Sequence, residues 1–371
     1  MNIVVFQENL LKQLSVAGRF LPSKTTTIPA LNSFLLEAAG GKITLTASNI
    51  ETTLTTHIAG KIEEEGKVLL PGKTILSLVP TLSGEKISIT VADKKLFIKG
   101  EKGEVSLLTE DPSEFPLLKN QEEKQQFKLN KKLLLEIVNQ VVFAASTDPM
   151  RAILTSVLVK LEDGLFIAAA TDGFRLAKIE RTMKSGLSFP KITLPAKVVE
   201  TLGVLVKEVE NEDIPVTFLG DGKQVLFSLG QASLLTQVVD GIFPDYGRII
   251  PVGAETKITI NREEFLRGVK FASILAREAS NIVRLKIQNN DLVITANAPQ
   301  TGDNKITLAV EKTGVDVESA FNYRFLIDFL SASSEENVTF ETNGSLSPGV
   351  FRLVKQPDYL YIVMPVRLQD S

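Results

Sequence analysis

The chain contains no cysteine and no tryptophan, and only one histidine among its 371 residues. The lack of cysteine excludes disulfides, thiolate catalysis and Cys-ligated metal, and it is compatible with a reducing cytoplasm. The single histidine, His57, lies in a strand-like stretch without a repeated Asp or Glu nearby, so a surface position is favoured over a catalytic one. No window approaches the roughly 20 apolar residues of a membrane span, and no signal peptide is evident. We therefore expect no metal, no cofactor and no membrane association.

The chain also lacks an excess of either positive or negative charge. The 41 Lys and Arg residues nearly balance 44 Asp and Glu residues, which leaves a net charge of −3 and argues against bulk electrostatic adhesion to nucleic acid. Hydrophobic content of 44% indicates a globular protein that is long enough for two or three domains. The cations that we expect on helices are Lys12, Arg19, Lys73, Lys131, Lys132, Lys197, Arg262, Arg267, Lys270 and Arg324. Helices commonly carry such residues. These cations could therefore equally form a solvated surface or bind an anionic ligand.

One set of landmarks occurs three times along the chain. Leu45–Asn49, Ala168–Asp172 and Ile294–Asn297 are similar short stretches that align at nearly constant spacing. A helical pattern precedes each stretch and a second helix follows it. The copies close on an aromatic residue or Met before proline, at Phe115-Pro116, Phe243-Pro244 and Met364-Pro365. Internal repeats outweigh local motifs, and we predict three copies of one domain with boundaries at residues 1–121, 122–250 and 251–371.

Each copy is predicted to be a sheet-rich α+β domain with two helices on one face. Helical periodicity predicts helices over residues 8–20, 72–79, 131–145, 196–206, 262–276 and 323–332. A single strand is expected over residues 52–60, and the last strand over 360–366. The polar run 120–126 has no period and is predicted to be a linker.

The stretch Ala170–Ala177 ends the second apolar run in an Asp172-Gly173 turn, where glycine allows the positive φ that a tight turn requires. We expect Arg175 and Leu176 to leave this turn as an exposed cation beside an exposed apolar side chain. Asp-Gly turns are common, but the other two copies lack the Gly-Phe-Arg-Leu insertion. Thr171, Asp172 and Arg175 are the nearest approach to a reactive group, without a general base, a metal-ligand set or a phosphate-binding loop. The sequence favours a binding protein.

The expected helices also limit the assemblies that could enclose DNA. Helices are about 10 Å across, so six side by side close a circle with a hole of about 9 Å, too small for a duplex roughly 20 Å wide. Twelve helices leave an opening of about 28 Å. If the protein forms a ring, a twofold dimer is the smallest one that admits duplex DNA.

The sequence resembles the bacterial β sliding clamps, the processivity subunits of replicative DNA polymerase III. The resemblance covers the whole chain and rests on Thr171–Ala177, Phe243–Tyr246 and Tyr361–Leu368. It implies the DNA clamp fold in a head-to-tail homodimer whose ring encircles double-stranded DNA without sequence preference. It also implies a non-catalytic role in the bacterial cytoplasm. The implied partners are the replicative polymerase, the clamp loader and other clamp-binding peptides.

The resemblance further implies three sets of site residues. The partner-peptide cleft between the second and third domains would comprise Leu154, Thr171, Gly173, Phe174, Arg175, Leu176, Pro244, Arg248, Ile249, Asn322, Phe325, Leu346, Ser347, Val363, Met364, Pro365, Val366, Arg367 and Leu368. Leu176 and Met364 would form its apolar floor. DNA contacts would come from Lys73 and Lys197, and from Lys24 and Arg151 as substitutes for the Arg and Tyr that some family members use and that residues 25–28 and 152–153 lack here. The dimer contact would pair Val105 and Leu107 on an edge strand with Ile274 and Leu275 of a neighbouring chain.

Apart from those DNA-contact positions, the chain departs from the family pattern in three places. Phe174 replaces a more polar residue and should make the cleft more apolar, Gly247 replaces a common basic residue, and Gln369–Ser371 extend past the usual end. Two other classes of protein stay open at this point. One is a three-repeat scaffold or ligand-binding protein that does not bind nucleic acid, and the other is an enzyme built on Thr171, Asp172 and Arg175. A solution mass of twice the 40.5 kDa of one chain would favour the clamp.

Overall fold

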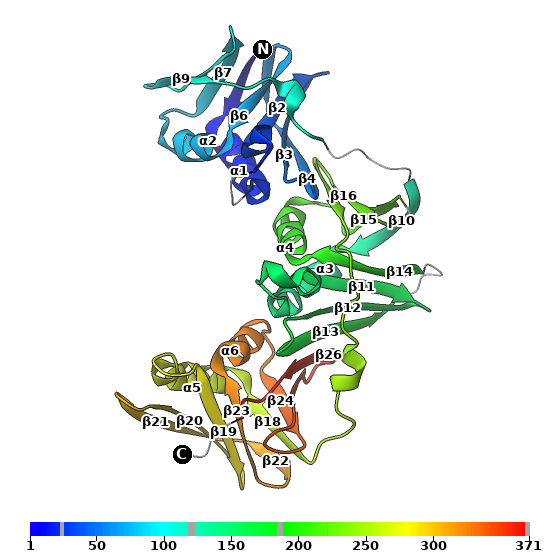
Figure 1. Cartoon of the computed structure of the whole chain (residues 1–371), viewed down its shortest axis with the longest axis vertical. Coiled ribbons are helices and arrows are strands. Elements are labelled where there is room, and N and C mark those ends of the chain that lie inside the picture. The colour runs from blue at the N-terminus through cyan, green and yellow to red at the C-terminus, as the bar shows by residue number, and fades with distance from the viewer. Residues whose placement is uncertain (23–25, 118–122, 184–187, 221, 368–371) are drawn as a thin grey trace. The chain divides into compact units, whose positions relative to one another are not determined.

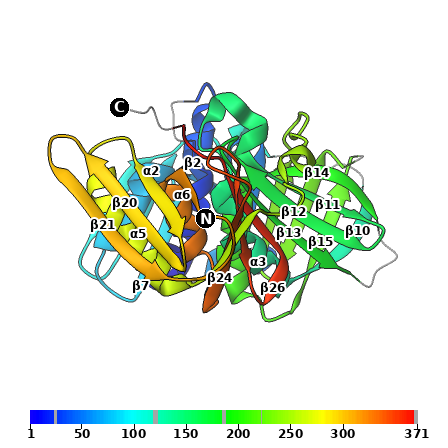
Figure 2. The same ribbon diagram turned by 90° about the horizontal axis from the view of Figure 1, so that it is seen from below.

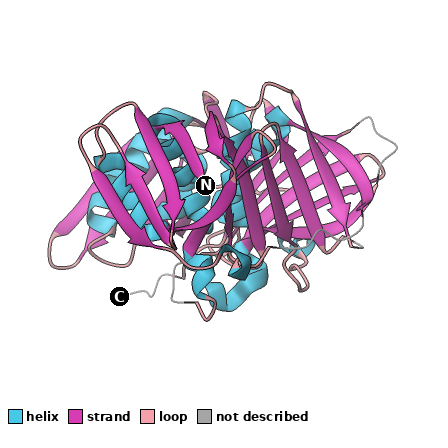
Figure 3. Cartoon of the chain, turned by 90° about the horizontal axis from the view of Figure 1, so that it is seen from above, coloured by secondary structure: helices cyan, strands magenta, loops and turns pink. Residues whose placement is uncertain are grey.

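The computed structural model describes residues 1–22, 26–117, 123–183, 188–220 and 222–367 (Figure 1). The chain divides into two compact units, residues 1–134 with 200–238 and residues 135–199 with 239–371, which are described separately. Strands make up most of both units, and the helices pack against them (Figure 3). Within the described residues, no helix is long and apolar enough to cross a membrane.

The described part of the chain contains six α-helices, and all six lie where the periodicity predicts them. They are α1 (Gln7–Ala17), α2 (Gly72–Leu78), α3 (Lys131–Gln140), α4 (Ala196–Leu205), α5 (Arg262–Ala276) and α6 (Tyr323–Ser331). The ends predicted for the first and third helices are 3-10 turns instead, η1 (Gly18–Phe20) and η5 (Val142–Ala144). The prediction for α5 is right at both ends. Its start is set by Asn261, whose Oδ1 accepts hydrogen bonds from the backbone N–H groups of Glu263 and Glu264.

The first unit contains two antiparallel sheets. The five-stranded sheet has the order β5 (Gly60–Glu64), β1 (Asn2–Phe6), β7 (Lys86–Ala92), β8 (Lys95–Lys99) and β9 (Glu104–Leu108). The eight-stranded sheet has the order β10 (Glu123–Asn130), β15 (Asp213–Leu219), β16 (Gln224–Leu229), β17 (Ala232–Gln237), β4 (Thr52–Ile58), β3 (Lys42–Ser48), β2 (Ser33–Ala39) and β6 (Gly66–Pro71). Because β17 pairs with β4, strands far apart in the sequence form one continuous sheet. In α1, Leu10, Leu14 and Ala17 are buried and Leu11 is half-buried, so one face of this helix packs inward.

The second unit is built in the same way. Its nine-stranded sheet has the order β14 (Phe189–Pro195), β11 (Ser156–Glu162), β12 (Leu165–Thr171), β13 (Arg175–Thr182), β26 (Gln356–Val363), β25 (Gly349–Leu353), β24 (Asn337–Thr342), β18 (Thr256–Asn261) and β22 (Glu311–Gly314). Its four-stranded sheet has the order β21 (Gly302–Ala309), β20 (Asp291–Ala298), β19 (Ile282–Gln288) and β23 (Val317–Asn322), and α5 packs against β20 and β21 (Figure 2). The pairing of β13 with β26 joins the predicted turn region to the last strand of the chain.

Three predictions about strands and linkers are wrong. Residues 123–126 of the predicted linker belong to β10, because backbone pairing with β15 compensates for their polar composition at the edge of the sheet; residues 120–122 lie outside the described residues. The single strand expected over 52–60 is divided into β4 and β5, which belong to different sheets. The last strand begins at Gln356 and ends at Val363, because the chain then leaves β13: the Val366 N–H donates to the Ala320 carbonyl in β23.

Candidate functional site

The turn between β12 and β13 is held by the side chains that begin it. Thr171 Oγ1 donates to the Arg175 carbonyl at 2.5 Å and accepts from the Gly173 N–H at 3.1 Å. Asp172 Oδ1 accepts from the N–H groups of Phe174 and Arg175 at 2.9 and 3.0 Å. Gly173 has a φ of +92°, in the region that favours glycine, as predicted. The turn therefore presents Phe174 on a rigid base.

Arg175 is not the exposed cation that the sequence led us to expect, because its side chain is only 10% exposed. Its guanidinium donates from Nε to Asp172 Oδ2 at 3.0 Å, from Nη1 to Asp328 Oδ2 at 2.5 Å and from Nη2 to the Phe143 carbonyl at 2.7 Å. It also lies over the Phe325 ring, 4.6 Å from the centroid. A planar group with several fixed donors can be buried where acceptors match its geometry, and here they do.

The electrostatics of this cluster keep Arg175 charged. Burial acts to lower the pKa of the guanidinium, but Tyr361, Asp328 and Asp172 outweigh it, so that its pKa is raised above the ordinary value. Burial also raises the pKa of Tyr361, whose hydroxyl donates to the Phe325 carbonyl at 3.0 Å. The arrangement orients neighbouring segments, and the Asp172 and Asp328 carboxylates are engaged with Arg175, so it does not support the alternative of an enzyme built on Thr171, Asp172 and Arg175.

Leu176 is also not exposed, and the prediction that it forms part of a surface floor is wrong. It is fully buried in an apolar cluster with Leu158, Ala169, Phe243, Val350, Leu360 and Ile362. Ile153, Tyr246 and Ile250 pack against this cluster. These side chains pack on the sheet face that carries Leu176, so Leu176 has no route to solvent.

The pairing of β13 with β26 brings together predicted cleft residues from two distant parts of the sequence. Arg175 is opposite Val363 and Leu176 is opposite Ile362. The Met364 N–H donates to the Phe174 carbonyl at 2.8 Å, which holds the segment after β26 beside the turn. The Val366 N–H similarly donates to the Ala320 carbonyl at 2.8 Å.

The other predicted cleft residues differ in exposure. Phe174 is 58% exposed, and Leu346, Ile249, Gly173, Pro244, Arg248 and Arg367 are exposed as well. Half-buried are Asn322, Phe325, Ser347, Met364, Pro365 and Val366, whereas Leu154, Thr171 and Val363 are buried. Asn322 has a structural task, since its Oδ1 caps α6 by accepting from the Arg324 N–H. Leu368 and the predicted extension Gln369–Ser371 lie outside the described residues.

Sequence reasoning missed the partners of Arg175 in α6 and near α3. Asp328 is the only acidic residue in the otherwise apolar segment Leu326–Leu330, a signal that could have indicated a buried ion pair. Phe143 contributes its backbone carbonyl, a role that a side-chain pattern in the sequence does not predict. Tyr361 was included only as part of the terminal motif.

The predicted DNA-binding cations lie in different settings. Lys24 is outside the described residues, and Lys73 in α2 and Lys197 in α4 are exposed. Arg151 is exposed too, but its Nη1 donates to the Asp172 carbonyl at 3.1 Å. Some cations expected on helix surfaces serve the fold instead. Arg262 donates to the Glu335 and Leu330 carbonyls, and Lys12 pairs with Glu208 at 2.9 Å.

The predicted dimer contact involves an edge strand and a partly exposed helix face. Val105 and Leu107 are half-buried on β9, which is an edge strand of the five-stranded sheet. Ile274 is 54% exposed on α5 and Leu275 is half-buried beside it. The edge strand β21 lies against the same helix. Unpaired edges of this kind are available for pairing with another chain.

Comparison with known protein families decides among the alternatives. Models of the N-terminal, central and C-terminal domains of the DNA polymerase III beta subunit match residues 1–119, 128–245 and 247–367. The chain belongs to the DNA polymerase III beta subunit family. The beta sliding clamp of Chlamydia muridarum is 27% identical over 373 residues, which cover 100% of both chains.

Solved structures of this family are similar over the same length. The DNA polymerase III beta subunit of Thermotoga maritima is 28% identical, with a TM-score of 0.90 over 99% of this chain and 100% of that one. The sliding clamp of Pseudomonas aeruginosa bound to griselimycin is 26% identical, with a TM-score of 0.89 and the same coverage. The predicted family, the clamp fold and a non-catalytic sliding-clamp function are confirmed.

Proposed function

We propose that two copies of the chain close a ring around double-stranded DNA, and that the surface around Phe174 receives short peptides from the polymerase, the clamp loader and other partners. One observation carries the peptide site. An exposed aromatic side chain stands on a turn that is fixed by Thr171 and Asp172 on one side and by the Met364 N–H on the other. A rigid apolar anchor of this type binds with little loss of conformational freedom.

The proposed peptide surface has contacting and supporting residues. Phe174, Ile249, Leu346 and Met364 would contact the peptide, because their side chains are exposed or half-buried. Arg175, Leu176 and Val363 would support it from below, because they are buried or nearly so. Arg248, paired with Asp245 at 2.8 Å and largely exposed, would belong to the polar rim.

The proposed ring holds DNA by enclosure. Lys24, Lys73, Arg151 and Lys197 would make short-lived, sequence-independent contacts with phosphates. The net charge of −3 is then no obstacle, because retention does not require tight adhesion.

We place the three repeats at residues 1–121, 122–250 and 251–371. The lack of cysteine and the replicative role of the family support a cytoplasmic location.

Retention on circular DNA tests the ring. Protein loaded on a nicked circle should remain bound when salt rises from about 50 to about 200 mM, a change that would weaken adhesion through several phosphate contacts by orders of magnitude. Cutting the circle once should release it. The variant Lys73→Glu/Lys197→Glu should impair loading more than retention. Loss from intact circles as salt rises would contradict the proposal, and so would retention on linear DNA.

A further inference from the structure

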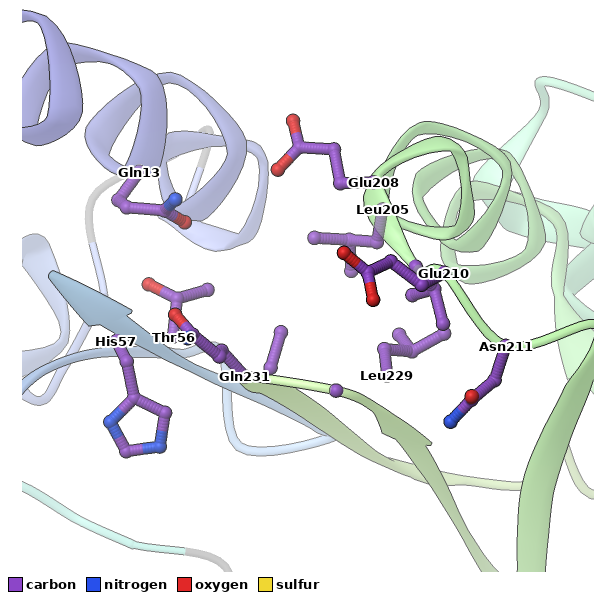
Figure 4. A pocket seen from close by; sticks show the side chains of 12 residues that line it. Gln13, Thr56, His57, Leu205, Glu208, Glu210, Asn211, Leu229 and Gln231 are labelled. Carbon is purple, nitrogen blue, oxygen red and sulfur yellow. The ribbon is translucent and has the colours of Figure 1, made fainter. Parts of the chain in front are cut away.

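A cavity of about 500 Å³ lies in the first unit, beside the place where β4 pairs with β17 (Figure 4). Its walls come from α1, from β4, from the segment that follows α4 and from the turn between β16 and β17. The side chains that matter below are Gln13, Thr56, Leu205, Glu208, Glu210 and Leu229. None of these residues belongs to the proposed peptide, DNA or dimer surfaces.

The cavity has a negative wall that already attracts a cation. Glu208 Oε1 lies 2.9 Å from the Lys12 ammonium, and both side chains are about half exposed. Glu210 follows two residues later on the same wall and has no ion-pair partner among the described residues. The Gln13 amide faces this side of the cavity (Figure 4). The wall therefore disfavours anions and offers oxygen atoms to a donor of N–H groups.

A buried hydroxyl on the floor points to a ligand independently of the acidic wall. Thr56 is only 1% exposed, and its Oγ1 has no hydrogen-bond partner within the described part of the chain. Figure 4 shows Thr56 on the side of β4 that faces Gln13, whereas the His57 ring extends from the opposite side. Buried polar atoms of native proteins are nearly always satisfied. A ligand that donates a hydrogen bond inside the cavity would satisfy this one.

The remaining walls are aliphatic. Leu205, Val209 and Leu229 line the cavity and are buried, so a ligand's hydrocarbon segment would contact them without disturbing the fold. No cluster of three or more Asp, Glu or His side chains in the described ranges could hold a metal ion. An organic cation with an apolar body fits this combination better than a bare ion does.

We infer that this cavity binds a linear alkyl diammonium ion. One ammonium would lie at the Glu208 and Glu210 carboxylates, the methylene chain would lie along Leu205 and Leu229, and the second ammonium would donate to Thr56 Oγ1 and to the Gln13 amide oxygen. The site is independent of the proposed peptide surface, so a bound diammonium ion leaves peptide affinity unchanged.

Ligand-observed saturation-transfer NMR on the full chain tests this assignment, with 1,4-diaminobutane as the probe. n-Butylamine keeps one charge and 1,4-butanediol keeps none. The diamine should bind about fivefold more tightly than the monoamine, because only its second ammonium can make charge-assisted hydrogen bonds to Thr56 Oγ1 and the Gln13 amide oxygen. Its affinity should fall as salt rises, and the diol should show no saturation transfer. Equal binding of diamine and monoamine would overturn the inference.

Variants locate the site. Glu208→Gln/Glu210→Gln should weaken diamine binding about tenfold. The matched control is Glu63→Gln/Glu65→Gln, which has the same spacing and also includes a carboxylate paired with lysine, Glu63 with Lys61 at 3.1 Å; it should leave binding unchanged. Thr56→Val should weaken binding without lowering the melting temperature, since it removes a hydroxyl that has no partner. If the two double variants lost diamine affinity equally, the diamine would be associating with carboxylates in general. That result would overturn the site.

Discussion

At the residue scale, the best-defined feature is the charged cluster around Arg175. Its guanidinium connects the β12–β13 turn, helix α6 and the segment that follows α3 through hydrogen bonds of 2.5 to 3.0 Å. Removing one partner from a buried ion pair leaves the other charge uncompensated, which costs more than the pair itself contributes. Arg175 thus acts as a positioning residue beneath Phe174.

The substitution Arg175→Met should lower the free energy of unfolding by about 2–3 kcal/mol, because Asp172 loses its partner while Asp328 remains partly hydrated. Urea denaturation measures this change. Arg248→Met is the matched control, since Arg248 makes an exposed pair with Asp245 and should contribute less than about 1 kcal/mol. Equal effects of the two substitutions would refute the role of burial.

Phe174 and Leu176 should behave in opposite ways although two positions separate them. Phe174→Ala removes an exposed anchor and should weaken binding of a clamp-binding peptide by at least about tenfold with little change in stability. Leu176→Ala creates a cavity in a buried cluster and should cost about 2–5 kcal/mol of stability. Fluorescence anisotropy and urea denaturation separate the two effects. A normal peptide affinity for Phe174→Ala would remove Phe174 from the proposed surface.

At the element scale, β26 connects most of the second unit. It pairs with β13 on one side and with β25 on the other. Its two tyrosines are fully buried, and both rings stack on Phe329, with centroids 6.1 Å away for Tyr359 and 5.1 Å away for Tyr361. The Tyr359 hydroxyl donates to the Gln140 carbonyl at 3.0 Å. One strand therefore couples the turn, helix α3 and helix α6.

The buried tyrosines predict a loss of stability at alkaline pH. Burial raises the pKa of Tyr359 and of Tyr361 above the ordinary value near 10. Above that pH the unfolded chain releases protons that the folded chain keeps, so the free energy of unfolding should fall by up to about 1.4 kcal/mol per pH unit for each tyrosine. Thermal unfolding of wild type and Tyr359→Phe/Tyr361→Phe between pH 9 and 11 checks this. The variant should lose stability less steeply, and equal slopes would contradict it.

At the scale of the whole molecule, edge strands and exposed apolar side chains remain available for assembly. The edge strand β9 carries Val105 and Leu107, and Ile274 on α5 is more than half exposed. Closing a dimer through these features would remove two sheet edges at once. A ring that encloses DNA depends on this closure, and the affinity of any single phosphate contact matters less.

Ile274→Arg should reduce the solution mass from twice the 40.5 kDa of one chain to that of one chain. A charge in an apolar contact has no partner and is costly to desolvate. The same variant should be lost from circular DNA. Val354→Arg is the control, because Val354 is 52% exposed against 54% for Ile274 and lies outside the proposed contact. Light scattering that shows a dimer for Ile274→Arg would exclude this interface.

Local pattern in the sequence determined the three repeats, the six helices and the Asp172–Gly173 turn. Helical and strand periodicities depend on neighbours within one element, and the special φ of Gly173 depends on the glycine itself. Together with the motifs at Thr171–Ala177 and Tyr361–Leu368, these signals were enough to indicate the family.

Only the tertiary structure decided which side chains reach solvent and which strands meet. Arg175 and Leu176 look exposed in sequence, but Asp328 from α6 and Ile362 from β26 cover them, and both partners lie more than 150 residues away. The polar run 123–126 becomes a strand because β15 supplies backbone partners. The unpartnered Thr56 hydroxyl likewise appears only where β4 meets β17. Burial and pairing arise from contacts between distant segments, which local periodicity does not encode.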